Sequence, residues 1–115
     1  MIGTDTIKEV LATYTKHGWV LRRVLLSPVL KAQVIDDAKE LFPDAEIVDS
    51  DLDAAWFSRQ SRKDSVAWEL RRLGPLPFAL VEVVDTDLPA DELENVLSDA
   101  EERLRLSGLK PRPSG

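Results

Sequence analysis

Three carboxylates at alternating positions, Asp49, Asp51 and Asp53, are the first place in this sequence to look for chemistry. A calcium loop of the EF-hand type begins with oxygen ligands at positions 1, 3 and 5, and it also needs glycine at position 6 and glutamate at position 12. Counted from Asp49, those two positions hold Ala54 and Gln60. In an extended strand, alternate residues lie about 6.6 Å apart, which is too far for three carboxylates to hold one ion at roughly 2–2.6 Å. We therefore predict a solvated acidic loop and no metal site; a weak Mg²⁺ or Ca²⁺ site is the alternative.

The residue types that support covalent and acid–base catalysis are few. The chain has no cysteine, so a thiolate nucleophile, a disulfide and a cysteine-bound metal are all excluded. His17, the only histidine, precedes Gly18 at the expected end of a helix, where the helix dipole favours a positive charge. Asp53 and the Glu69–Arg71 segment share the order of an Asp…Glu-x-Lys nuclease arrangement, but arginine replaces the lysine that tunes proton transfer. Without a Gly-x-Ser-x-Gly motif or a glycine-rich phosphate loop, the sequence predicts no enzyme, no catalytic residue and no cofactor.

The charges are segregated along the chain. Fifteen Lys and Arg residues against 21 Asp and Glu give a net charge of −6, which argues against a general nucleic-acid binder. The segments 36–53 and 85–102 are strongly acidic, whereas the segment between them is basic. Its cations predict an anion-binding surface along a β-hairpin: Arg59, Arg62, Lys63, Arg71 and Arg72. The alternative is that these side chains form surface ion pairs with the acidic helices.

The periodicity of apolar residues predicts the elements that position these groups. A capping-box spacing at Thr6 and apolar residues from Ile7 to Tyr14 predict a first helix that begins near residues 4–6 and ends at Gly18. Residues 19–27 form a strand, and the hydroxyl N-cap of Ser27 followed by proline begins a second helix that ends at Pro43.

Residues 45–84 are predicted to be mainly β. A short strand at 45–48 precedes a hairpin that turns at residues 61–64, and a rigid link at 74–77 precedes the strand 78–84, which we place centrally because it is the most apolar. A last helix begins near residues 87–89 and ends at Gly108. The order α-β-α-β-β-β-α predicts an α+β two-layer sandwich with a mixed, mainly antiparallel sheet of about four strands and three helices. This domain covers residues 1–108, and residues 109–115 form a disordered tail.

The hairpin also predicts which aromatic residues are buried. If Phe57 lies opposite Trp68, both face the core, and Trp56 lies opposite Glu69 on the other face. The strand 78–84 is apolar on both faces, which favours cover on both. If all helices pack on one face, the other keeps an apolar patch with charged edges, formed by Trp19, Trp56, Phe78 and Leu80. The alternative is that the first helix crosses the sheet and covers these residues.

The sequence therefore predicts a small non-enzymatic domain that binds a protein partner or a second copy of itself through this patch. Anion or nucleic-acid binding through the basic hairpin is the alternative function. No apolar run approaches the ~20 residues of a membrane span, and the N-terminus lacks the features of a signal peptide. Together with the absence of cysteine, these features predict a cytoplasmic protein that does not enter a membrane.

Overall fold

The computed structural model describes residues 4–73 and 78–109, with side chains described up to residue 106. These residues form a mixed sheet with strand order β2-β1-β3-β4-β5, in which β1 and β2 are parallel and the other neighbours antiparallel. The elements are α1 (Thr4–Lys16), β1 (Val20–Leu26), α2 (Pro28–Val34), α3 (Ala38–Leu41), β2 (Glu46–Asp49), β3 (Ala54–Arg62), β4 (Ser65–Arg72), β5 (Ala79–Asp85) and α4 (Ala90–Leu109). The predicted α+β class is confirmed, with five strands and four helices in the described part.

Local signals place most of the boundaries in the first half of the chain. Gly18 follows α1 with φ +87°, a left-handed conformation that glycine adopts without strain. The hydroxyl of Ser27 accepts a hydrogen bond from the backbone N–H of Leu30 at 3.3 Å, and Pro28 is the first residue of α2. The expected single helix up to Pro43 is interrupted at residues 35–37, where two consecutive aspartates favour a turn over continuous helix.

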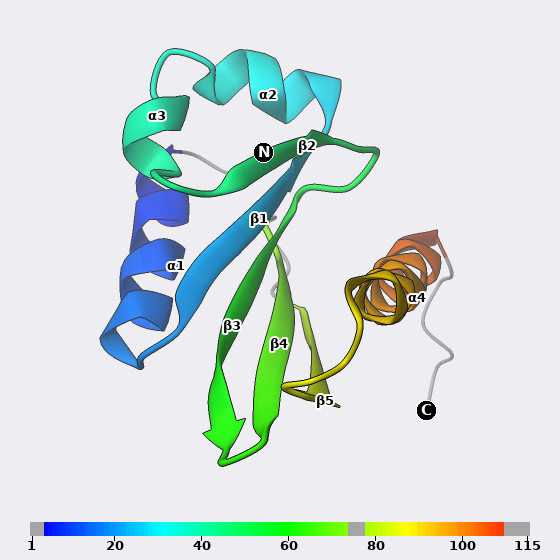
Figure 1. Cartoon of the computed structure of the whole chain (residues 1–115). Coiled ribbons are helices and arrows are strands. Elements are labelled where there is room, and N and C mark those ends of the chain that lie inside the picture. Colours follow the sequence, from blue (N-terminus) through cyan, green and yellow to red (C-terminus); the bar gives the residue numbers. More distant parts are fainter. Residues whose placement is uncertain (1–3, 74–77, 110–115) are drawn as a thin grey trace, which may run out of the picture.

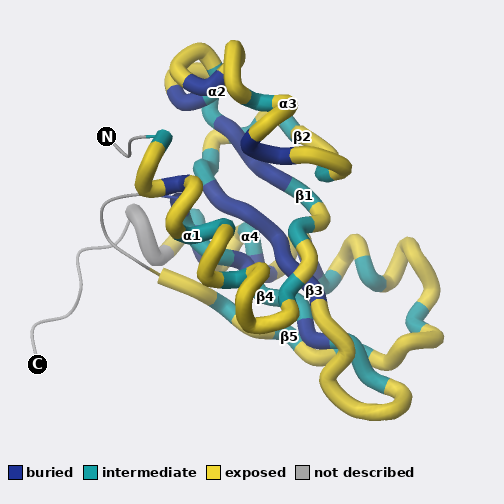
Figure 2. Tube along the Cα trace, turned by 90° about the vertical axis from the view of Figure 1, so that its left-hand side faces the viewer, coloured by how far each residue is buried: buried dark blue, intermediate teal, exposed yellow. Residues whose placement is uncertain are grey.

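Helices cover both faces of the sheet (Figure 1). Helices α1, α2 and α3 lie on one face, and α4 lies on the other. We call the buried residues of the first face the α1 cluster: Ile7, Val24, Leu26, Leu30, Val34, Leu41, Phe42, Ala55, Phe57 and Leu73. Those of the second face are the α4 cluster: Leu25, Ala54, Trp56, Leu70, Leu97, Ala100 and Leu104. Both clusters draw on β1 and β3, which Figure 2 shows as the most buried strands.

The register of the β3–β4 hairpin differs by one residue from the prediction. Phe57 pairs with Glu69, and Ser58 pairs with Trp68. The turn contains only residues 63–64, and the register shifts between Gln60 and Arg62, so a bulge takes up the residue that a longer loop was expected to hold. A slip of one residue changes the face of a side chain. Trp68 therefore does not face Phe57 but contacts Trp56 edge to face, with ring centroids 6.2 Å apart.

The position of β5 also differs from the prediction, because this strand forms an edge of the sheet and not its centre. The centre belongs to β3, whose first five residues are all buried. Residues of β5 alternate between exposed and half-buried. The prediction that other elements cover both faces of this strand, which rested on its apolar residues, is therefore wrong.

At the C-terminal end, α4 continues through Gly108, the expected cap, to Leu109. The expected link at residues 74–77 and residues 110–115 of the expected tail lie outside the described residues. Within the described part of the chain, no helix combines the length and the apolar character that crossing a membrane requires.

Candidate functional site

The four residues of the predicted apolar patch lie in different environments. Trp56 is fully buried under α4, and its indole N–H donates to Glu101 at 2.8 Å. The expectation of an exposed Trp56 was therefore wrong, and α4, not the first helix, covers it. Trp19 packs beside the α1 cluster, and Leu80 packs beside the α4 cluster. Only Phe78 counts as exposed, at 37%, next to the guanidinium of Arg72.

A different apolar surface lies along β5. Val81 and Val83 are 54% and 58% exposed, although both are large aliphatic side chains within a strand. They share a face with Ala79, on the side of the sheet where α1 packs over Val24 and Phe57. The α1 layer therefore covers the β1–β3 half of the sheet and leaves the outer strand of this face open (Figures 1 and 2).

The backbone of β5 shows which of its polar groups are free. The N–H of Arg72 donates to the carbonyl of Phe78 at 2.9 Å, and the N–H of Thr86 donates to the carbonyl of Asp64 at 2.8 Å. In an antiparallel ladder, the backbone groups of alternate residues bond to the same neighbouring strand. The N–H and C=O groups of the even-numbered residues of β5 therefore point toward β4. Ala79, Val81 and Val83 then point both their N–H and their C=O groups to the outer side, where no other described strand lies. Asp85 offers only its N–H there, because its carbonyl accepts from the N–H of Leu88 at 3.1 Å.

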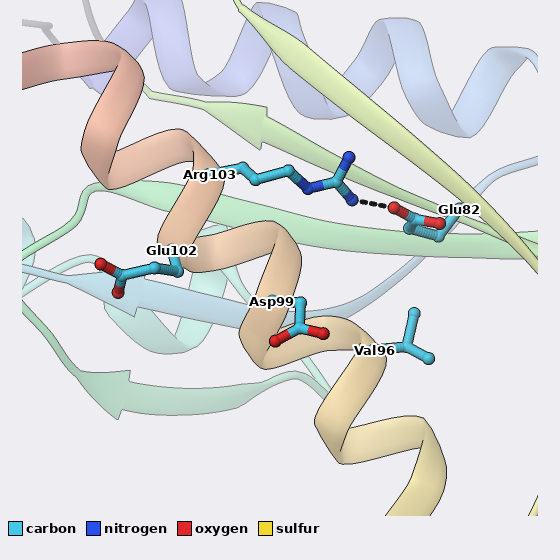
Figure 3. A pocket seen from close by; sticks show the side chains of 5 residues that line it. All are labelled: Glu82, Val96, Asp99, Glu102 and Arg103. Carbon is cyan, nitrogen blue, oxygen red and sulfur yellow. Dashed lines mark hydrogen bonds and ion pairs between the residues drawn. The ribbon is translucent and has the colours of Figure 1, made fainter. Parts of the chain in front are cut away.

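The charge at the middle of β5 is neutralised from the other side of the sheet. Glu82 faces α4 and forms an ion pair with Arg103. Figure 3 shows the side chain of Arg103 extended toward Glu82, while Glu102 points away from this pair. The exposed hollow beside the pair, of about 480 Å³, is also lined by Val96 and Asp99. Natural sheet edges are commonly protected by charged side chains that point outward, and β5 has none between Ala79 and Val84 on its open face.

The opposite edge of the sheet is protected. Strand β2 has only four residues, and acids stand at both of its ends. Glu46 pairs with Arg23 at 2.9 Å, and Asp49 pairs with Lys31 at 2.7 Å. A short strand with charged ends offers little backbone to another strand. The free edge of β5 is therefore the strongest candidate for an interaction surface.

The acidic trio has three separate partners. Asp49 binds Lys31, and Asp51 accepts two hydrogen bonds from Arg105, at 2.7 and 2.8 Å. These hydrogen bonds from Arg105 hold the pKa of Asp51 below its usual range. Asp53 accepts hydrogen bonds from the N–H and the hydroxyl of Ser27, at 2.8 and 3.1 Å, and so orients the cap of α2. In the described ranges, no three carboxylate, histidine or cysteine side chains converge on a point where a metal ion could bind.

The five cations of the predicted anion surface are distributed over the hairpin. Arg62 and Lys63 lie at its turn, whereas Arg71 and Arg72 lie at the far end of β4, on opposite faces. Arg59 stacks over the ring of Trp19 at 4.6 Å and donates to the carbonyl of His17 at 2.8 Å. The structure thus does not bring all five together, although Arg59 and Lys63 line one hollow together with Arg22, which the sequence pattern did not single out.

A polar contact between Tyr14 and Glu69 lies within the α1 side. The hydroxyl of Tyr14 donates to Glu69, and its ring stacks on Phe57 with centroids 4.0 Å apart. Burial raises the pKa of Tyr14, and the hydrogen bond to Glu69 raises it further, so the hydroxyl stays protonated. This contact occupies Glu69, and Asp53 binds Ser27, so the two carboxylates of the nuclease-like order have different partners.

No motif or charge pattern in the sequence predicted the free edge of β5, because the exposure of this strand depends on the strand order of the sheet. The chain matches no family model, and neither a curated protein nor a solved structure matches it.

Proposed function

We propose that this chain is a self-associating interaction domain in which two copies pair antiparallel through β5 and continue the sheet from one copy into the other. The observation that supports this most strongly is the combination of free backbone groups and exposed valines on one strand. Ala79, Val81 and Val83 offer unpaired N–H and C=O groups, and the exposed side chains of the two valines add apolar surface beside them. An exposed, apolar edge strand without outward charges is a template for pairing with another strand.

The strand is complementary to itself. In an antiparallel pair centred on Glu82, Val81 lies opposite Val83 of the second copy, and Ala79 lies opposite Asp85. Ala79, Val81 and Val83 point both of their backbone hydrogen-bonding groups outward, and Asp85 points its N–H outward, so these groups can form the ladder. The valines of both copies then form one apolar stripe on the open face. The two Glu82 side chains meet on the α4 side, where each already pairs with an Arg103.

Sedimentation over a range of protein concentrations tests this proposal. We expect the natural chain to form a dimer and the double variant Val81→Lys/Val83→Lys to be monomeric, because four added charges across the pair weaken it by about 100-fold or more. The matched control is Ile47→Lys on β2, a 40% exposed residue of the other edge, and it should dimerise like the natural chain. A natural chain that stays monomeric at several hundred micromolar, or a lysine variant that still dimerises, contradicts the proposal.

Amide hydrogen exchange locates the contact. In the monomer, the outward amides of Val81 and Val83 exchange quickly, and in the dimer they become protected. Protection that increases with concentration at these residues supports β5 pairing, whereas protection that increases elsewhere assigns the dimer to another surface. If the chain is monomeric but captures an extended peptide at the same amides, a partner strand takes the place of the second copy. We also propose a cytoplasmic location, which the absence of cysteine supports.

A further inference from the structure

Two hollows on the α4 side of the sheet join into one groove, which shares only the end of β5, at Val84 and Asp85, with the proposed dimer contact. They enclose about 350 and 370 Å³, each within the range of about 300–1,000 Å³ that small-molecule sites occupy. The two hollows share four of their lining residues: Arg22, Ser58, Val66 and Thr86. The groove crosses β1, β3, β4 and the end of β5 beside the N-terminal end of α4, and the rest of α4 covers the other half of this face.

A bulge in β1 supplies the cation at the centre of the groove. The pairing of β1 with β3 shifts between Leu21 and Arg23, so Arg22 is an additional residue and its side chain reaches the same face as Arg23. Arg23 is held by Glu46 and Glu94. Arg22 instead donates through Nε to the hydroxyl of Ser58 at 2.8 Å, and no described carboxylate lies within ion-pair distance of it.

The two ends of the groove differ in character. At one end, Arg59, Gln60 and Lys63 join Arg22 and the hydroxyl of Thr86, and none of the described residues that line this hollow is a carboxylate. At the other end, apolar side chains line the groove: Trp68, Val84, Leu88 and Leu93. Asp85 lies at this second end, so an anionic group is repelled there and favoured at the first.

We propose that this groove binds a small monocarboxylate that carries a short aliphatic chain. The carboxylate accepts hydrogen bonds from Arg22, whose planar guanidinium suits that group, and Lys63 adds a second positive charge. Ser58 is only 3% exposed and holds Arg22 in place through its hydroxyl. The aliphatic chain of the ligand lies along Trp68 and Leu93, where its apolar surface is buried away from water.

Titration of the 115-residue chain with octanoate, followed by the indole N–H signals in NMR spectra, tests this inference. Trp68 lines the groove and Trp19 lies on the α1 side, so octanoate should move the signal of Trp68 and leave that of Trp19 in place. Octan-1-ol tests the chain alone, and inorganic phosphate tests the anion alone. We expect each to bind at least about ten-fold more weakly than octanoate, because each makes only half of the contacts.

Two variants make the test specific. Arg22→Gln and Lys63→Gln should each weaken octanoate binding, Arg22→Gln by about ten-fold or more, while leaving the binding of octan-1-ol unchanged. Arg62→Gln, at the nearby turn but outside the groove, is the matched control and should bind octanoate like the natural chain. Equal affinity for octanoate and octan-1-ol, unchanged binding by folded Arg22→Gln, or no movement of the Trp68 signal at millimolar octanoate overturns the proposal.

Discussion

Trp56 and Phe57 are neighbours in β3, yet each belongs to a different layer of the protein. Both are at most 1% exposed, and they point to opposite faces of the sheet. Phe57 lies in the α1 cluster, where it stacks on Tyr14 at an angle of 12° between the rings. Trp56 lies in the α4 cluster and meets Trp68 at 76°. One strand thus anchors both layers through adjacent residues.

The two layers are held in different ways. On the α1 side, the described contacts around Phe57 are aromatic and aliphatic, with one hydrogen bond from Tyr14 to Glu69. On the α4 side, polar contacts surround the apolar cluster. Glu94, Glu101, Arg103 and Arg105 of α4 bind Arg23, Trp56, Glu82 and Asp51, respectively. Exposed ion pairs stabilise little, so the attachment of α4 to the sheet depends mainly on Trp56 and its few apolar neighbours.

The largest expected effect follows from the Trp56→Ala substitution. Removal of this buried ring should lower the free energy of unfolding by about 3–5 kcal/mol, a large share of a total of about 5–15 kcal/mol, as urea denaturation can measure. Phe57→Ala is the matched variant on the other face and should cost a similar amount. Hydrogen exchange separates the layers: amides of α4 should exchange faster in Trp56→Ala, and amides of α1 in Phe57→Ala. Equal acceleration of both helices in both variants would show that the layers open as one unit.

Trp68→Ala should have a smaller effect. This ring is only half-buried and lies beside Trp56, so its loss should cost about 1–2 kcal/mol in the same urea experiment. If Trp68 faced Phe57 in the α1 cluster, as the sequence suggested, the cost would match that of Trp56→Ala. A loss as large as that of Trp56→Ala contradicts the observed register.

Tyr14→Phe removes one hydrogen bond from the α1 side and keeps the stacked ring. We expect a loss of about 1 kcal/mol in the free energy of unfolding, because Glu69 loses its donor while the packing on Phe57 remains. Glu101→Gln on the α4 side is the matched control, since glutamine keeps an oxygen that accepts from Trp56, and its effect should be smaller. If Glu101→Gln lowers the free energy of unfolding more than Tyr14→Phe does, the expected order of the two contacts is wrong.

The smallest effect concerns alkaline pH. The pKa of Tyr14 is higher in the folded chain than its ordinary value of about 10, so unfolded chains lose this proton first. The stability that Tyr14 contributes is complete below about pH 10 and decreases as the pH rises above it. The difference in stability between the natural chain and Tyr14→Phe should therefore stay constant from pH 7 to about 9 and decrease toward pH 11. A difference that grows over this range contradicts the direction of the shift.

The helices and strands that have local causes could be predicted from the sequence. The helix α1, the Ser27–Pro28 start of α2, the strands and the α+β class follow from periods and caps that span a few residues. The interruption of the second helix at residues 35–37 was missed, although its two aspartates are visible in the sequence.

The face on which each side chain lies, the edge strands of the sheet and the partners of the charged residues depend on contacts between distant segments. A single extra residue in the β3–β4 hairpin moved Trp68 to the other face, and such a bulge leaves no clear mark in the pattern of apolar residues. Strand order placed the apolar β5 at an edge, while α4, from the far end of the chain, covered Trp56. Asp51 and Asp53 likewise bind Arg105 and Ser27, which lie far from them in the sequence. These contacts depend on how distant segments meet in space, and neither local propensity nor residue spacing contains that information.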